Sequence, residues 1–110
     1  MLKKFIIERN VPGVGGSTLE QAKAMARKSN EILAQLGSDK IQWEQSYVTG
    51  DKTFCVYNAV NKDVIKEHAR LSGFPADIIT EVESVMTPKT GTEGVYGTTS
   101  KDSTQQVQMY

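Results

Sequence analysis

The spacing of apolar and polar residues changes several times along the chain, and each change marks the boundary of a predicted element. A short apolar run at residues 3–9 precedes a segment rich in Pro and Gly, which predicts a strand ending in a loop. Between residues 19 and 36, apolar residues recur every three or four positions, as they do on one face of a helix. Ser17 and Glu20 have the spacing of a capping box at the start of this helix.

A hairpin and a second helix are predicted next. Over residues 41–48 the period becomes two, and the turn sequence TGDK separates this strand from a further strand at residues 53–59. Asn61 can cap a second helix, which Gly73 would end. A last strand is predicted within residues 78–86.

The order strand, helix, strand, strand, helix, strand is that of the ferredoxin-like βαββαβ fold. We therefore expect an α+β domain over residues 1–88, with a four-stranded antiparallel sheet carrying both helices on one face. The other face would expose Trp43, Tyr47, Tyr57 or their neighbours. Such a surface predicts a homodimer of the dimeric α/β-barrel type, joined through the open sheet faces around an interior able to hold a ligand.

The composition limits the classes of partner. Thirteen basic residues balance thirteen acidic ones, so the chain has no overall charge that would attract nucleic acid or an anionic membrane. Apolar runs are too short for a membrane span or a signal peptide, and we expect a cytoplasmic protein. Residues 89–110, rich in Gly, Ser, Thr and Gln, are predicted to form a mobile tail, or an arm that orders against a partner.

The chain contains one cysteine, Cys55, and one histidine, His68. His68 lies in the middle of the apolar stripe of the second helix and should point toward the sheet, either as a hydrogen-bonded core residue or as a metal ligand. Cys55 is either a small buried side chain or a soft ligand. Alternation alone does not decide its face. If Phe54 and Val56 fill the space beneath the helices, Cys55 faces the dimer interior.

Two charged residues, Glu8 and Arg9, end the first strand. Glu8 shares strand parity with Ile6, so its carboxylate is predicted to point into the dimer interior. A buried carboxylate needs a partner or a cation. The alternative is an ordinary ion pair with Arg9 or Lys52 at the end of the sheet.

Four motifs carry a family resemblance: E-R at residues 8–9, S-Y-V-x-x-D-K at 46–52, C-V-Y at 55–57 and H-A-R-x-x-G-F-P at 68–75. With these motifs, residues from about Phe5 to Pro88 resemble a family of small bacterial domains of unknown function whose members are often described as nickel-binding proteins. The resemblance implies a ferredoxin-like fold, a dimer joined through its sheets, and a divalent transition metal in some members. The motif residues with ligand chemistry are Glu8, Asp51, Cys55 and His68.

The first functional hypothesis is therefore a small, non-enzymatic dimer that binds Ni²⁺ or another divalent transition metal, for which an imidazole and a thiolate are suitable donors. If His68 faces the sheet from the helix and Cys55 faces the dimer interior from the strand, the two lie on opposite sides of the sheet and cannot share one metal within a protomer. Either the parity of the strand is reversed, or the sites are separate, or two chains contribute ligands. The alternative is a cofactor-free enzyme or ligand-binding protein that uses a dimer cavity around Trp43 and Tyr47, by analogy of fold. A purely structural role for the polar residues is the third.

Overall fold

A computed structural model gives the fold and describes residues 1–93 and 96–97. The main body follows the predicted order of helices and strands, with a short 3-10 turn, η1, before the first helix. Its elements are β1 (Lys3–Asn10), η1 (Val14–Gly16), α1 (Leu19–Leu36), β2 (Ile41–Val48), β3 (Lys52–Ala59), α2 (Lys62–Ser72) and β4 (Ile78–Glu81). Three short elements follow: β5 (Ser84–Val85), α3 (Thr90–Glu93) and β6 (Tyr96–Gly97).

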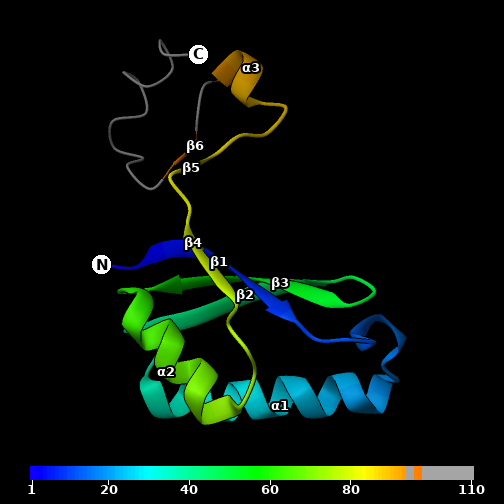
Figure 1. Cartoon of the computed structure of the whole chain (residues 1–110). Coiled ribbons are helices and arrows are strands. Elements are labelled where there is room, and N and C mark those ends of the chain that lie inside the picture. The colour runs from blue at the N-terminus through cyan, green and yellow to red at the C-terminus, as the bar shows by residue number, and fades with distance from the viewer. Residues whose placement is uncertain (94–95, 98–110) are drawn as a thin grey trace.

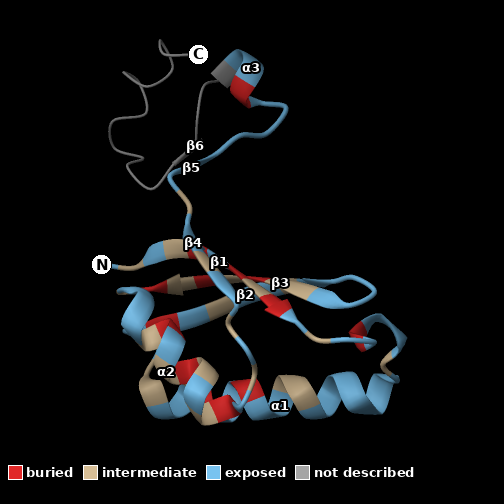
Figure 2. Cartoon of the chain, viewed as in Figure 1, coloured by how far each residue is buried: buried red, intermediate tan, exposed pale blue. Residues whose placement is uncertain are grey.

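The four long strands form one antiparallel sheet in the order β2-β3-β1-β4. Both long helices lie against the same face of this sheet, which we call the covered face, and the opposite face is the open face (Figure 1). The predicted α+β class and four-stranded antiparallel sheet are thus confirmed. Buried residues gather between the sheet and the helices (Figure 2). The core cluster consists of Phe5, Ile7, Ile41, Cys55, Tyr57, Ala59 and Ile65.

Strand β2 contains a bulge that reverses its alternation. Trp43 pairs with Tyr57, but the next recorded pair joins Gln45 to Val56, so one extra residue lies in β2. Trp43 therefore faces the helices, whereas Gln45 and Tyr47 lie on the open face. The strict period of two predicted for residues 41–48 was wrong beyond Trp43.

The helix ends show one further difference from the sequence prediction. The capping box of α1 is formed by Thr18 and Gln21, one position later than predicted. Ser17 cannot take this place because its N–H closes η1 by donating to the Val14 carbonyl at 3.0 Å. For α2 the predicted Asn61 cap is confirmed, since its side chain accepts the Val64 N–H at 3.0 Å.

The last predicted strand, at residues 78–86, divides into two. β4 ends at Glu81, and β5 pairs instead with β6, away from the four-stranded sheet (Figure 1). Of the predicted tail at residues 89–110, the structure describes residues 89–93 and 96–97, which include α3 and β6, and the others lie outside the described residues. No helix in the described part of the chain has the length and apolarity to cross a membrane.

Candidate functional site

Cys55 and His68 lie on the same side of the sheet. Cys55 is buried on β3 and belongs to the core cluster under the helices, so Phe54 and Val56 point to the open face. This is the reverse of the parity that would place Cys55 in a dimer interior. His68 points from α2 toward the sheet, as predicted, and is fully buried. Cys55 and His68 are therefore not separated by the sheet, which was the predicted obstacle to their sharing one metal.

The imidazole of His68 has one nitrogen paired and one unpaired. Nε2 lies 3.1 Å from Oγ of Ser29 on α1, and the ring lies 5.4 Å from the ring of Tyr57, centroid to centroid. Nδ1 is buried and has no hydrogen-bond partner among the described residues. Burial, and then the positive charge of Arg9, lowers the pKa of His68 to about 4. The imidazole is consequently neutral at pH 7.

The sequence analysis considered Arg9 only as an ion-pair partner for Glu8, whereas the structure shows Arg9 as a buried charge. Its side chain points from the end of β1 to the covered face and is only 4% exposed. The guanidinium donates to the Pro75 carbonyl, and its Nη2 lies 3.5 Å from the Tyr57 hydroxyl. No Asp or Glu side chain within residues 1–93 forms an ion pair with it. Arg9 shares the parity of Phe5 and Ile7, and this signal could have revealed a buried charge.

A cavity of about 540 Å³, partly open to solvent, lies beside Arg9 between the covered face, α1 and η1. We call it the Arg9 cavity. Trp43 and Tyr57 form one wall, with ring centroids 6.5 Å apart and planes 18° from parallel. Cys55 also lines the cavity, and its Sγ lies 3.5 Å from Oγ1 of Thr53. Burial raises the pKa of Tyr57, so its hydroxyl is protonated at neutral pH.

The two predicted carboxylate ligands lie elsewhere. Glu8 is on the open face, 28% exposed at its side chain, with Oε1 3.8 Å from Nζ of Lys52. Asp51 is in the turn between β2 and β3, where Oδ1 accepts the Gly13 N–H at 2.8 Å. Over residues 1–93, no three His, Cys, Asp or Glu side chains lie close enough together to hold a metal ion. One protomer therefore does not bring the four predicted ligands into one site.

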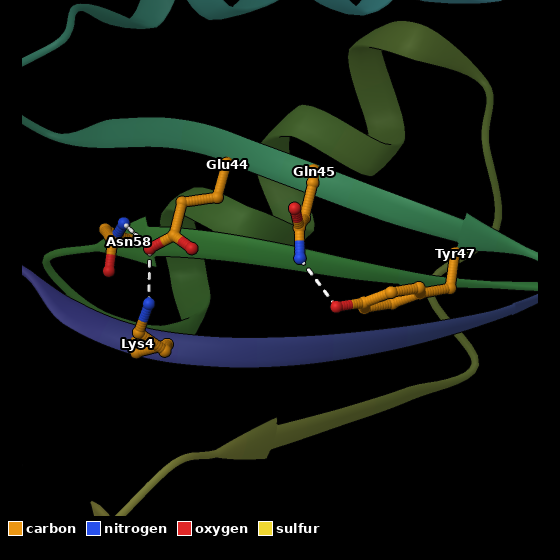
Figure 3. A network of polar contacts seen from close by, with 5 residues as sticks. All are labelled: Lys4, Glu44, Gln45, Tyr47 and Asn58. Carbon is orange, nitrogen blue, oxygen red and sulfur yellow. Dashed lines mark hydrogen bonds and ion pairs between the residues drawn. The ribbon is translucent and has the colours of Figure 1, made fainter. Parts of the chain in front are cut away.

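The open face combines a polar network with exposed apolar side chains. Glu44 forms an ion pair with Lys4 and accepts from Nδ2 of Asn58 at 2.8 Å, and Gln45 donates to the Tyr47 hydroxyl at 2.6 Å (Figure 3). The hydrogen bonds from Lys4 and then Asn58 lower the pKa of Glu44. The exposed apolar residues on this face include Ile6, Tyr47 and Ile78. Trp43 and Tyr57, which were candidates for this face, lie on the covered face instead.

Comparison with known proteins identifies the family. Residues 5–82 match the sequence profile of the family described as nickel responsive protein SCO4226-like. No curated protein matches the chain. The crystal structure of SCO4226 from Streptomyces coelicolor A3(2) is similar in fold, with a TM-score of 0.59 and 18% sequence identity over 72% of this chain and 94% of that chain. Because the profile covers well over half of the sequence, the chain belongs to the nickel responsive, SCO4226-like family.

Proposed function

We propose that the protein is a non-enzymatic homodimer that binds a divalent transition metal such as nickel. The observation that carries this proposal is membership of a family described as nickel responsive. The proposed dimer is of the ferredoxin-like barrel type, in which two open sheet faces meet.

Exposed apolar side chains support the dimer. On the open face Ile6 is 38% exposed, Tyr47 58% and Ile78 49%. Burial of these side chains against the same surface of a second copy would remove them from water, which is favourable. Such an interface is isologous: both copies contribute the same surface, so a residue near the two-fold axis lies close to its own counterpart.

For the metal, we propose a position at the open face with Glu8 as a donor. Dimerisation would bring two copies of Glu8 to one interface, where their carboxylates would supply oxygen donors alongside water in place of the contact with Lys52. The covered face is less suitable for a cation. A divalent ion between Cys55 and His68 would lie in the same buried region as the charge of Arg9, and like charges repel strongly where water is excluded.

The test is calorimetric titration of Ni²⁺ into the tag-free, metal-stripped protein. We expect a dissociation constant below roughly 0.1 mM, which corresponds to about 5.5 kcal/mol. Glu8→Gln should weaken binding at least about tenfold, since it removes a charged donor. Glu20→Gln, which removes an exposed carboxylate from α1, should not. Absence of Ni²⁺ binding to the unaltered protein would refute the proposed function.

The variants Cys55→Ser and His68→Ala separate the two faces. If the metal is held at the open face, both variants retain most of their affinity for Ni²⁺. Loss of binding in both, with Glu8→Gln unchanged, would place the metal on the covered face and contradict the argument from Arg9. The oligomeric state of each variant, measured by sedimentation, controls for loss of the dimer.

A small-molecule function is the second candidate, and the Arg9 cavity favours it. The sequence analysis placed such a ligand in the dimer interior, near Trp43 and Tyr47. Trp43 instead lines the cavity within one protomer. The chemistry of that cavity leads to a separate inference.

A further inference from the structure

The Arg9 cavity has the size and lining of a small-molecule site. Its volume of about 540 Å³ lies within the usual range for ligand pockets, roughly 300–1,000 Å³. The wall is mostly apolar, with polar groups at a few positions. The apolar lining residues include Val11, Val14, Met25, Trp43, Val48 and Phe74. A ligand that fills this space must therefore have an apolar body.

Arg9 gives the cavity a positive charge that nothing in residues 1–93 neutralises. A guanidinium is charged at every physiological pH, and a buried charge is costly unless it is paired. Arg9 has more N–H groups than its contacts with Pro75 and Tyr57 use. Because Arg9 also lines the cavity, its unused donors are available to a ligand.

Two titratable groups beside Arg9, Tyr57 and His68, supply no negative charge. The phenol of Tyr57 stays protonated and the imidazole of His68 stays neutral at pH 7, as described above. Among the described residues that line the cavity, Arg9 is the only Lys or Arg, and none is Asp or Glu. The site therefore presents a single positive charge within an apolar wall, which matches a ligand with a single negative charge.

We propose that the Arg9 cavity binds a small monocarboxylate with an aromatic or branched aliphatic body, its carboxylate on Arg9 and its body against Trp43. A planar guanidinium matches a carboxylate with two parallel hydrogen bonds. The Tyr57 hydroxyl beside Arg9 is a further donor to the same group. A phosphate dianion would find one cation and few other donors, so a monocarboxylate is favoured. The inference is independent of the proposed metal, which we place on the opposite face.

Trp43 provides the measurement, because it is the only tryptophan in the chain and lines the cavity. Its fluorescence is followed while phenylacetate or 4-methylpentanoate is added to the full chain in the presence of a chelator. The matched neutral probe is phenylacetamide, which has the same shape without the charge. Calorimetry with the same probes checks that a fluorescence change reports binding.

We expect saturable binding of both acids, and affinity for phenylacetamide about tenfold to a hundredfold lower than for phenylacetate. Arg9→Gln should abolish this preference for the acid, whereas Lys52→Gln, which removes a cation from the open face, should preserve it. Circular dichroism confirms that each variant is folded. If Arg9→Gln does not fold, the comparison of acid with amide in the unaltered protein still decides the matter.

Three results would overturn the proposal: no binding of either acid to the unaltered protein, equal affinity for phenylacetate and phenylacetamide, or competition by inorganic phosphate as strong as that by phenylacetate. Because a chelator is present throughout, none of these results depends on whether the protein binds nickel. Conversely, failure of the Ni²⁺ titration would leave the carboxylate measurement unaffected.

Discussion

The packing of η1 against the β2–β3 turn can be tested with a single methyl group. The Gly15 N–H donates to the Gly50 carbonyl at 3.0 Å, which holds the two segments together. A Cβ at Gly15 would lie 2.6 Å from the Thr49 carbonyl oxygen and 2.9 Å from Cα of Gly50. Both are backbone atoms, so no side chain can rotate away. Gly15→Ala must therefore displace the turn or η1.

Overpacking of this kind lowers the free energy of unfolding by about 1–3 kcal/mol. Replacing glycine also restricts the unfolded chain, which raises the free energy of unfolding by about 0.4–1 kcal/mol. We expect Gly15→Ala to lower the free energy of unfolding by about 1–2 kcal/mol. Gly16→Ala is the matched control. Its Cβ would meet nothing within 4 Å, and Gly16 is not among the glycines with positive φ. It should therefore be neutral or stabilising by up to about 1 kcal/mol.

Urea unfolding followed by circular dichroism measures both variants. Gly15 and Val14 line the Arg9 cavity, so Gly15→Ala should also weaken carboxylate binding there. If Gly15→Ala proved as stable as Gly16→Ala, η1 would not pack on the turn as described, and the boundary of the cavity would be wrong.

Three further predictions concern His68, the cap of α1 and the open face. The pKa of His68 is about 4 in the folded protein, below its ordinary value of 6.5, so the unfolded chain takes up the proton first as the pH falls. Stability should thus decrease from pH 7 to pH 5 by about 2 kcal/mol more than in His68→Gln, as measured by urea unfolding at both pH values; equal decreases would show that His68 does not titrate in this way. Thr18→Ala should lower the free energy of unfolding by about 1 kcal/mol through loss of the cap, whereas Ser17→Ala should change it by less than about 0.5 kcal/mol, and the reverse order would support the cap predicted from sequence. Ile6→Lys should convert the proposed dimer to monomer in sedimentation, because it would place two like charges in the proposed interface; an unchanged mass would exclude the open face from any dimer.

The periodicity of the chain was sufficient to predict the order of the main elements and the direction of His68. Both helices are amphipathic, and Asn61 and Gly73 have the chemistry of helix ends, so local signals agreed with the final fold. The cap of α1 was misplaced by one residue because Ser17 has suitable chemistry, yet its backbone already belongs to η1.

The faces of the strands were harder to predict. On β3, Phe54 and Val56 are as apolar as Cys55 and Tyr57, so alternation could not show which pair the helices cover. The bulge in β2 has no clear sequence signal, and because of it Tyr47 lies on the opposite face of the sheet from Trp43. The burial of Arg9 was not predicted because charged residues are rarely buried without a partner. That exception is the basis of the proposed carboxylate site.

The central claim is that the two faces of the sheet have different ligands, a metal at the open face and a small carboxylate under the helices. X-ray absorption at the nickel K edge of the Ni²⁺-loaded, tag-free protein tests it most directly, because only His68 can supply an imidazole to the metal. The account predicts a shell of oxygen donors without imidazole or sulfur scattering. An imidazole signal that disappears in His68→Ala would place the metal on the covered face and contradict the account.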